Sequence, residues 1–328
     1  MNFWYSWQID YLLLLQQFRE TTGGIFDNFF AEVTHWGETI IPLIVIATIY
    51  WCINTRLGTL IYLNFGVSTF ICDLLKNIAC IYRPWILDSR IQPVAGTKEM
   101  ASGYSFPSGH TQNAISVWGT IAHGTKNKIF AGLLIILILL IAFSRNYLGV
   151  HTPQDVIVSF IYTTPLIFLM PKFMKWVEEG KNRDIWVYIT AVFAVVACLL
   201  YEHFKSYPID YVDGKLLVSP YEMRIFAYPK LGLFLGIFTG WLLNARFINF
   251  DGSKGNFLGK IIRVIVGIPI LYFIYYNFLD CLTNYMDKKY AWFISSFAVI
   301  FFTTVVYPII ILFIEKLLKN KNNEEKEV

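Results

Sequence analysis

Long apolar runs separated by short polar segments dominate the chain from residue 39 onward. A helix needs roughly 20 mainly apolar residues to cross a bilayer, and nine runs reach or approach that length. These runs are 39–54, 57–75, 110–124, 128–148, 153–170, 185–203, 229–244, 261–279 and 291–314. The pattern therefore predicts an all-α fold, a polytopic integral membrane helical bundle with about nine transmembrane helices.

The first 38 residues follow a different pattern. Residues 1–19 mix aromatic side chains and leucines with polar residues, and Asp10, Gln16 and Gln17 interrupt the apolar positions. This mixture is typical of an amphipathic helix that lies in the membrane interface. We therefore predict an interfacial segment over residues 1–38, with a tenth membrane-spanning helix as the alternative.

The composition agrees with a membrane protein and adds little else. Hydrophobic residues make up 56% of the chain and charged residues 15%, whereas about a quarter is usual for charged residues in soluble domains. The net charge of +4 is spread through the loops and does not indicate nucleic-acid binding. The five cysteines match neither a zinc pattern nor a disulfide framework, so we interpret them as small apolar thiols.

The positions of lysine and arginine predict the orientation in the membrane. If the C-terminus is cytoplasmic, a nine-helix topology places 15 of the 27 Lys and Arg residues in cytoplasmic segments. Such an excess is typical of the cytoplasmic side. It predicts a charged cytoplasmic tail over residues 315–328. It also predicts an extracytoplasmic position, or a lumenal one in a cell with organelles, for the stretch Ser144–Asp155.

A first polar cluster, Lys76–Pro84, lies at the end of the second apolar run. The predicted topology places it on the same side of the membrane as Ser144–Asp155. Lys76 and Arg83 are seven residues apart, which is two helical turns, so both project from one face. Pro84 ends that helix. An ammonium point charge beside a bidentate guanidinium is a suitable pair for binding a phosphate.

A second cluster, Pro107–His110, precedes the third apolar run. Ser108, Gly109 and His110 are expected to begin a helix, whose free backbone N–H groups and dipole favour an anion. Gly109 lets the backbone approach a ligand closely, and the Ser108 hydroxyl can donate a hydrogen bond.

The third cluster, Ser144–Asp155, connects the fourth and fifth runs. His151 and Asp155 are four residues apart, so the carboxylate can reach the imidazole. An aspartate on one ring nitrogen fixes the tautomer and leaves the other nitrogen free to attack. Arg145 adds a third cation to the group.

Three cations, a helix N-terminus and two histidines together indicate a site for phosphoryl transfer. One histidine can attack phosphorus while the other protonates the leaving oxygen. The cations take the place of the metal ions that most phosphoryl-transfer enzymes use. Carboxylates that could hold magnesium are not clustered in the sequence, so we expect no metal and no other cofactor.

Two polar features lie outside these clusters. Asp73 lies within the second run, where a buried charge is costly. We expect it to pair with Lys76 or Asn77 and do not include it in the site. Residues 202–224 form a polar segment that we expect to be a solvated connector, with a substrate-gating loop as the alternative.

The three clusters resemble the signature of the type-2 phosphatidic acid phosphatase family, which is related to vanadium-dependent haloperoxidases. That signature is Lys-x6-Arg-Pro, then Pro-Ser-Gly-His, then Ser-Arg-x5-His-x3-Asp, and the chain matches every fixed position in order. The resemblance implies that His151 is the nucleophile that forms a phosphohistidine, that Asp155 orients it, and that His110 is the general acid. It also implies a phosphate cradle made of Lys76, Arg83, Ser108, Gly109 and Arg145.

The resemblance further implies a division of the chain. The phosphatase core covers residues 39–170, and additional C-terminal transmembrane helices cover 171–314. The nine-run layout is similar to that of glucose-6-phosphatase and sphingosine-1-phosphate phosphatase, which carry extra C-terminal helices. Residues 85–106 separate the first two motifs and are expected to lie over the site.

The sequence thus predicts a metal-independent membrane phosphatase. It would hydrolyse a lipid phosphate monoester or pyrophosphate at the extracytoplasmic or lumenal face through a phosphohistidine. The expected partners are the lipid substrate and the bilayer, with no nucleic acid and no obligate protein. The expected location is a bacterial cytoplasmic membrane, or an ER-type membrane if the source is eukaryotic. A sugar-phosphate phosphatase, a phosphotransferase and a catalytically silent lipid-binding relative remain open alternatives.

Overall fold

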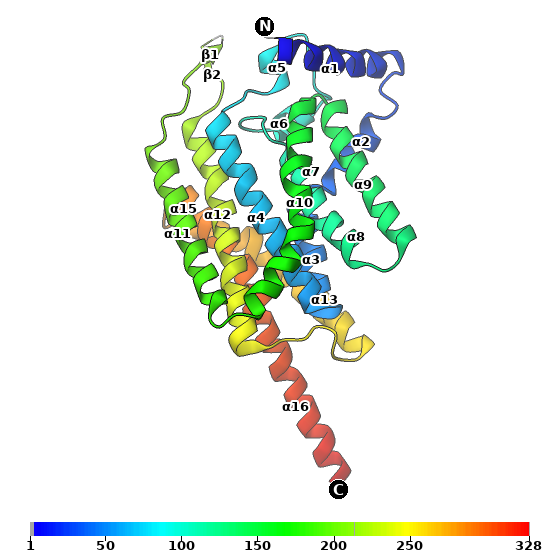
Figure 1. The fold of residues 1–328 in the computed structure, drawn as a ribbon, viewed down its shortest axis with the longest axis vertical. Coiled ribbons are helices and arrows are strands. Elements are labelled where there is room, and N and C mark those ends of the chain that lie inside the picture. Colours follow the sequence, from blue (N-terminus) through cyan, green and yellow to red (C-terminus); the bar gives the residue numbers. More distant parts are fainter. Residues whose placement is uncertain (1–2, 213, 328) are drawn as a thin grey trace.

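The computed structural model describes residues 3–212 and 214–327 and is almost entirely helical (Figure 1). The described part contains one small sheet, an antiparallel hairpin of β1 (Tyr211–Val212) and β2 (Lys215–Leu216). Tyr211 lies opposite Leu216 in its register. The predicted all-α class is therefore confirmed.

The helices of the first half are short at the motifs and long between them. In chain order they are α1 (Phe3–Thr21), α2 (Asp27–His35), α3 (Ile40–Cys52), α4 (Thr55–Ala79), α5 (Pro84–Leu87), α6 (Thr97–Met100), α7 (Gly109–Ala114), η1 (Ile115–Gly119), α8 (Thr120–Gly124), α9 (Lys128–Tyr147) and α10 (Pro153–Glu178). The second half adds α11 (Arg183–Phe204), α12 (Pro220–Leu243), η2 (Asn244–Ile248), α13 (Phe257–Phe273), η3 (Ile274–Phe278), α14 (Leu279–Thr283), α15 (Lys288–Phe301), η4 (Phe302–Val306) and α16 (Tyr307–Glu327). The η elements are π-helical segments that continue the helices on either side.

Seven helical stretches of the described chain are long and apolar enough to cross a membrane. The pair α2 and α3, bent by 44°, would be an eighth. The predicted run 110–124 forms the continuous helix α7–η1–α8, which is shorter than the roughly 20 residues that a bilayer requires. The chain is thus an integral membrane helical bundle, and the count of nine spans remains a prediction.

Polar caps define where several of the long helices begin. The side chain of Asn54 accepts a hydrogen bond from the Leu57 amide at the start of α4. Asn127 does the same for two amides of α9. Ser219 caps α12 in the same way. Such caps satisfy amides that have no partner inside the helix, which fixes the ends of the helices more sharply than hydropathy does.

Helix α1 lies across one end of the bundle, beside α5, while α16 leaves the opposite end (Figure 1). Ile9 and Leu12 of α1 are buried against Ile91. Gln8 accepts a hydrogen bond from the backbone amide of Gln154 at 3.0 Å. The helix is thus held on the end of the bundle by packing and hydrogen bonds, and its position in the membrane interface remains a prediction.

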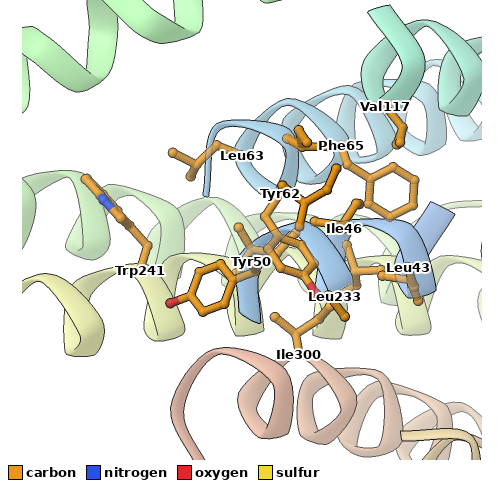
Figure 2. Close-up of a cluster of buried hydrophobic side chains, with 14 of the residues drawn as sticks. Leu43, Ile46, Tyr50, Tyr62, Leu63, Phe65, Val117, Leu233, Trp241 and Ile300 are labelled. Carbon is orange, nitrogen blue, oxygen red and sulfur yellow. The ribbon is translucent and has the colours of Figure 1, made fainter. Parts of the chain in front are cut away.

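One continuous apolar core joins the helices of residues 39–170 to the C-terminal helices (Figure 2). Tyr50 and Tyr62 are buried in it, and the Trp51 indole donates a hydrogen bond of 2.7 Å to the Thr303 carbonyl of η4. Inside a bilayer the hydrophobic effect does not favour helix association, so close packing and interhelical hydrogen bonds supply the stability.

Helices α12 and α15 approach closely along a stripe of three glycines, Gly232, Gly236 and Gly240. A Cβ atom at Gly232 would lie 2.1 Å from the Phe293 carbonyl oxygen, and one at Gly240 would lie 1.9 Å from Thr304 Oγ1. The glycines recur every four residues, the spacing that lets two membrane helices bring their backbones together. This stripe was not identified from the sequence.

Candidate active site

The three motifs meet at the end of the bundle opposite α16. The Ser108 amide donates a hydrogen bond of 3.0 Å to the Asp155 carbonyl, and the Ser159 hydroxyl donates one of 2.9 Å to the Ser108 carbonyl. Lys76 donates to the Pro107 carbonyl at 3.1 Å. These bonds connect α4, the start of α7 and the start of α10, so the sequence motifs form one cluster.

His151 and Asp155 form a buried pair in that cluster. Their Nδ1 and Oδ2 atoms are 3.1 Å apart, and the side chains are 3% and 1% exposed. The Thr152 amide donates to the same carboxylate oxygen at 2.9 Å and completes a capping box at the start of α10. Because a carboxylate only accepts, Nδ1 carries the proton and Nε2 presents its lone pair.

Ser105 is a third member of this pair that the sequence analysis missed. Its hydroxyl donates a hydrogen bond of 2.5 Å to Asp155 Oδ2 and lies 3.3 Å from His151 Nδ1. The Ser105 amide donates to the Ile81 carbonyl at 2.7 Å, which holds the loop in place. A single serine in an irregular loop carries no periodic or spacing signal, so the sequence offered nothing by which to find it.

Arg83 contacts Nε2 of His151, the ring nitrogen that does not face Asp155. Its Nη1 atom lies 3.0 Å from His151 Nε2 and donates to the Val150 carbonyl at 2.9 Å. The other guanidinium nitrogens donate to the carbonyls of Gly103 at 3.1 Å and Ser102 at 2.9 Å. The guanidinium is buried and joins the loop before α7 to the histidine.

Lys76 is held entirely by that loop. Its ammonium donates to the carbonyls of Tyr104, Ser105 and Pro107 at 2.8, 3.1 and 3.1 Å. An ammonium has three N–H donors, so all of them face backbone oxygens here. The end of the insert 85–106, which we expected to lie over the site, thus forms a wall of it.

Arg145 enters the cluster from α9 and is also buried. Its Nη1 atom donates to Thr34 Oγ1 at 2.5 Å, which brings α2 of the N-terminal segment into the site. Its Nε atom is buried and has no hydrogen-bond partner among the described residues. A buried guanidinium with an unused donor suits an anion, because an unsatisfied polar group is costly to bury.

Ser108 and Gly109 lie where α7 begins. The Ser108 side chain caps the helix by accepting from the Thr111 amide. Gly109 borders open space, since a Cβ built there would meet no atom within 4 Å. The helix N-terminus therefore has room beside it for a ligand.

His110 lines a cavity of about 730 Å³ together with Lys76 and Gly109. The opposite wall comes from the C-terminal helices and includes Phe226 and Lys230. His151 is not among the lining residues, and it is itself buried behind the Arg83 contact. In this conformation His110 faces the cavity and His151 is covered.

The position of His151 keeps it neutral. It lies in the connector between α9 and α10, and its pKa is held well below the usual value, first by burial and then by the Arg83, Arg145 and Lys76 cations. A neutral imidazole retains the Nε2 lone pair that a nucleophile needs.

Two expectations about neighbouring polar residues need correction. Asp73 pairs with Lys230 of α12 at 2.5 Å and accepts from Asn77 at 3.2 Å, so the expected Asn77 contact is confirmed and Lys76 is not its partner. The segment 202–224 is not simply solvated. Tyr207 is buried and donates to the Asn77 side chain at 3.0 Å, because the segment folds back over the end of α4.

Comparison with protein families matches two parts of the chain. The model of the PAP2 superfamily matches residues 57–179. A second model, described as the PAP2 superfamily phosphatase transmembrane extension, matches residues 228–320. The first match contains all three motifs, and the second covers most of the C-terminal helices.

Two curated relatives are similar to this chain. Phosphatidylglycerophosphatase B from Bacillus subtilis (strain 168) is 34% identical over 167 residues, which is 46% of this chain and 76% of that protein. Lipid phosphate phosphatase delta from Arabidopsis thaliana is 24% identical over 156 residues, 44% of this chain but only 37% of that protein. A solved structure, the crystal structure of a transmembrane PAP2-type phosphatidylglycerolphosphate phosphatase from Bacillus subtilis, is 26% identical. It covers 55% of this chain and 90% of that chain, with a TM-score of 0.45.

Proposed function

Because this chain belongs to the PAP2 superfamily of membrane phosphatases, we propose that it hydrolyses a phosphate monoester or pyrophosphate carried by a membrane lipid. The observation that carries the proposal is the buried pair of His151 and Asp155 with Arg83 at the free ring nitrogen. This arrangement provides a nucleophile, a group that orients it and a cation for the phosphate.

In the first step, His151 Nε2 attacks phosphorus and the bond from phosphorus to the leaving oxygen breaks. Arg83 moves from Nε2 to the phosphate oxygens, where its charge stabilises the transition state. Burial, Arg145 and His151 hold the pKa of His110 well below its usual value while the cavity is free of substrate. His110 therefore takes up a proton together with the anionic substrate and gives it to the leaving oxygen. Asp155 stabilises the positive charge that develops on the imidazole.

In the second step, water enters the place that the lipid alcohol has left. His110, now neutral, takes a proton from this water while its oxygen attacks phosphorus. The phosphorus–nitrogen bond breaks, inorganic phosphate is released, and His151 regains its lone pair. Proton uptake and release by His110 balance over the two steps.

Several residues position the catalytic groups or the phosphate without transferring protons. Lys76 keeps the loop of residues 102–107 against the site through its three carbonyl contacts, and its charge adds to the field of Arg83 and Arg145. Ser108 and Gly109 place the amides of α7 beside the cavity. These cations and amides supply the charge stabilisation that metal ions provide elsewhere.

A lipid substrate is supported by the surroundings of the site. The cavity opens beside helices that cross the membrane, and apolar side chains form much of its lining. Both curated relatives carry names of lipid phosphate phosphatases. A lipid could therefore enter laterally with its headgroup at the cluster and its tail among the helices.

The substrate test is phosphate release by the purified full-length protein in detergent, with EDTA present. We expect release from lipid phosphates that EDTA does not diminish and that vanadate, a mimic of pentacoordinate phosphorus, inhibits. Glucose 6-phosphate serves as the soluble comparison. Release from glucose 6-phosphate alone would favour a sugar-phosphate phosphatase, and a strict requirement for magnesium would contradict the proposed mechanism.

We propose that the site faces the extracytoplasmic or lumenal side and that the protein lies in a bacterial cytoplasmic membrane or an ER-type membrane. The distribution of Lys and Arg supports this orientation. The start of α12 packs over the site, since Met223 contacts Gly103, and Tyr221 bonds to Asp287 beyond α14. The exposed Cys281 of α14 is therefore at the same end of the bundle as the motifs.

Cys281 makes the orientation testable in intact bacterial cells. A membrane-impermeant thiol reagent should label the wild-type protein from outside, and Cys281→Ser should lose that label because the thiol has gone. Labelling that appears only after the cells are opened would place the site on the cytoplasmic side. Thermal unfolding of Cys281→Ser in detergent checks that the exposed substitution leaves the fold intact.

A further inference from the structure

The C-terminal helices form one wall of the cavity that reaches the phosphate cradle. Helices α3, α4 and α7 contribute Leu43, Phe65, Lys76 and His110 on one side. Helices α12 and α15 face them on the other side, with lining residues Phe226, Lys230, Leu233 and Trp292. Three of these four residues, Lys230, Leu233 and Trp292, lie in the segment matched by the transmembrane-extension model, so this extension shapes the space next to the site.

The lining of the cavity changes from polar near the motifs to apolar in the core of the bundle. Lys76 and His110 lie at the motifs, at the end of the bundle. Leu43, Phe65 and Leu233 belong to the apolar core, where Figure 2 shows their side chains. A volume of about 730 Å³ is in the range that accommodates a ligand of several hundred daltons. The polar part suits a headgroup, and the apolar part suits the beginning of a lipid tail.

Lys230 lies between these two parts. Its Nζ atom is 2.5 Å from Asp73 Oδ1. Asp73 precedes Lys76 by three residues on α4, a rise of roughly 4.5 Å along the helix axis. Because α4 ends at the motifs, Asp73 is the deeper of the two. The Lys230 ammonium is thus a second cation on the tail side of the cradle.

Lys76 and Lys230 differ in the number of N–H donors that remain free to bind a ligand. The Lys76 ammonium uses all three donors on loop carbonyls. Asp73 is the one hydrogen-bond partner of Lys230 in the part of the chain that the structure describes. The Lys230 side chain is 30% exposed and lines the cavity, so its remaining donors can reach a ligand.

We propose that Lys230 binds a second anionic phosphate of the substrate, located between the scissile phosphate and the lipid tail. The inference rests on the proposed lipid phosphatase function and names its substrate class. That class is a lipid diphosphate, or a lipid in which a phosphodiester precedes the terminal phosphate. Asp73 positions the ammonium and offsets its charge while the cavity is free of substrate.

The test removes the charges of both Lys230 and Asp73 rather than the charge of one of them. Removing Lys230 alone would leave Asp73 as a buried unpaired charge, which is strongly destabilising. The double variant Asp73→Asn/Lys230→Gln keeps two hydrogen-bonding side chains and removes both charges. The matched control is Asp251→Asn/Lys254→Gln, an exposed Asp–Lys pair with 3.6 Å between its charged atoms. It lies in the loop before α13 and outside this cavity.

We would measure kcat/KM for three lipids of similar tail length: a prenyl diphosphate, phosphatidylglycerophosphate and phosphatidate. The double variant should lose roughly 10- to 100-fold on the lipids with a second phosphate, as expected for one hydrogen bond between charged groups, and little on phosphatidate. A loss on only one of the first two would identify which linkage Lys230 binds. An equal loss on phosphatidate, or no loss on any lipid, would overturn the proposal.

Binding measurements separate this proposal from the proposed function. The dissociation constants of the same three lipids are measured in the His151→Ala background, with and without the neutralised pair. In this background the neutralised pair should again weaken the binding of the two lipids with a second phosphate and not that of phosphatidate, because binding does not need turnover. If the wild type releases no phosphate, the proposed function fails, and Lys230 is still tested by these constants. Equal weakening for all three lipids would assign the pair a purely structural role.

Discussion

The variant His151→Ala is expected to lose at least on the order of 10⁴-fold in phosphate release, as occurs when a catalytic nucleophile is removed. The imidazole is buried, its Nδ1–H faces Asp155 and its Nε2 faces Arg83, so no neighbouring group can replace it. A second readout is the intermediate itself. Brief exposure to a ³²P-labelled lipid followed by acid-free denaturation should label the wild type and leave His151→Ala unlabelled.

The control for this variant is His123→Ala. His123 is exposed at the far end of α8 and makes an edge-to-face contact with Phe168, away from the motifs. It should retain full activity and the same labelling. Thermal unfolding of both variants in detergent tests whether loss of activity reflects loss of the fold. Substantial turnover by a folded His151→Ala protein would show that another group attacks phosphorus.

The variant Arg83→Lys is expected to lose roughly 10²- to 10³-fold in kcat, the usual effect of removing one preorganised donor to the transition state. A lysine preserves the charge but not the planar fork that reaches His151, Val150 and the loop carbonyls together. The affinity for vanadate should fall by a factor similar to that of kcat, because vanadate occupies the place of the pentacoordinate phosphorus.

Arg90→Lys is the matched control for that substitution. Arg90 lies in the insert between the first two motifs and pairs with Asp88 at 2.7 Å, with 63% of its side chain exposed. Asp88 is buried, but the lysine of this variant would keep the positive charge at the exposed end of the pair and outside the motifs, so the variant should behave like the wild type. If Arg83→Lys kept wild-type kcat and vanadate affinity, the fork would be a structural contact with the loop and not a ligand of the phosphate.

Much of the site was visible in the sequence because its residues stand at fixed short spacings. Lys76 and Arg83 share one stretch of chain, and His151 lies four residues before Asp155, in the connector that leads into α10. The expectation that Lys76 and Arg83 share one helical face was wrong, because α4 ends at Ala79, Cys80 takes the left-handed conformation, and Arg83 is an extended residue. Pro84 begins α5 and does not end α4. The structure brings the three motifs together as expected, and the roles of the individual residues remain predictions for the experiments above.

Other members of the site could not be found in this way, because their partners are far along the chain. Ser105 reaches Asp155 across 50 residues, and Thr34 reaches Arg145 across 111. Lys230 pairs with Asp73 across 157 residues. No local pattern records such contacts, so the expectation for Asp73 identified its neighbour Asn77 on α4 and missed Lys230.

The sequence by itself determined the class of the protein, a membrane-embedded helical bundle with the three motifs of the PAP2 family, because hydropathy and short-range spacing are properties of the local chain. Only the tertiary structure decided what surrounds these motifs. The glycine stripe of α12 brings α15 close, the core joins α3 and α4 to η4, and Lys230 thereby arrives beside the cradle. Those contacts depend on how the helices pack, and packing is decided by the whole bundle at once rather than by any one segment.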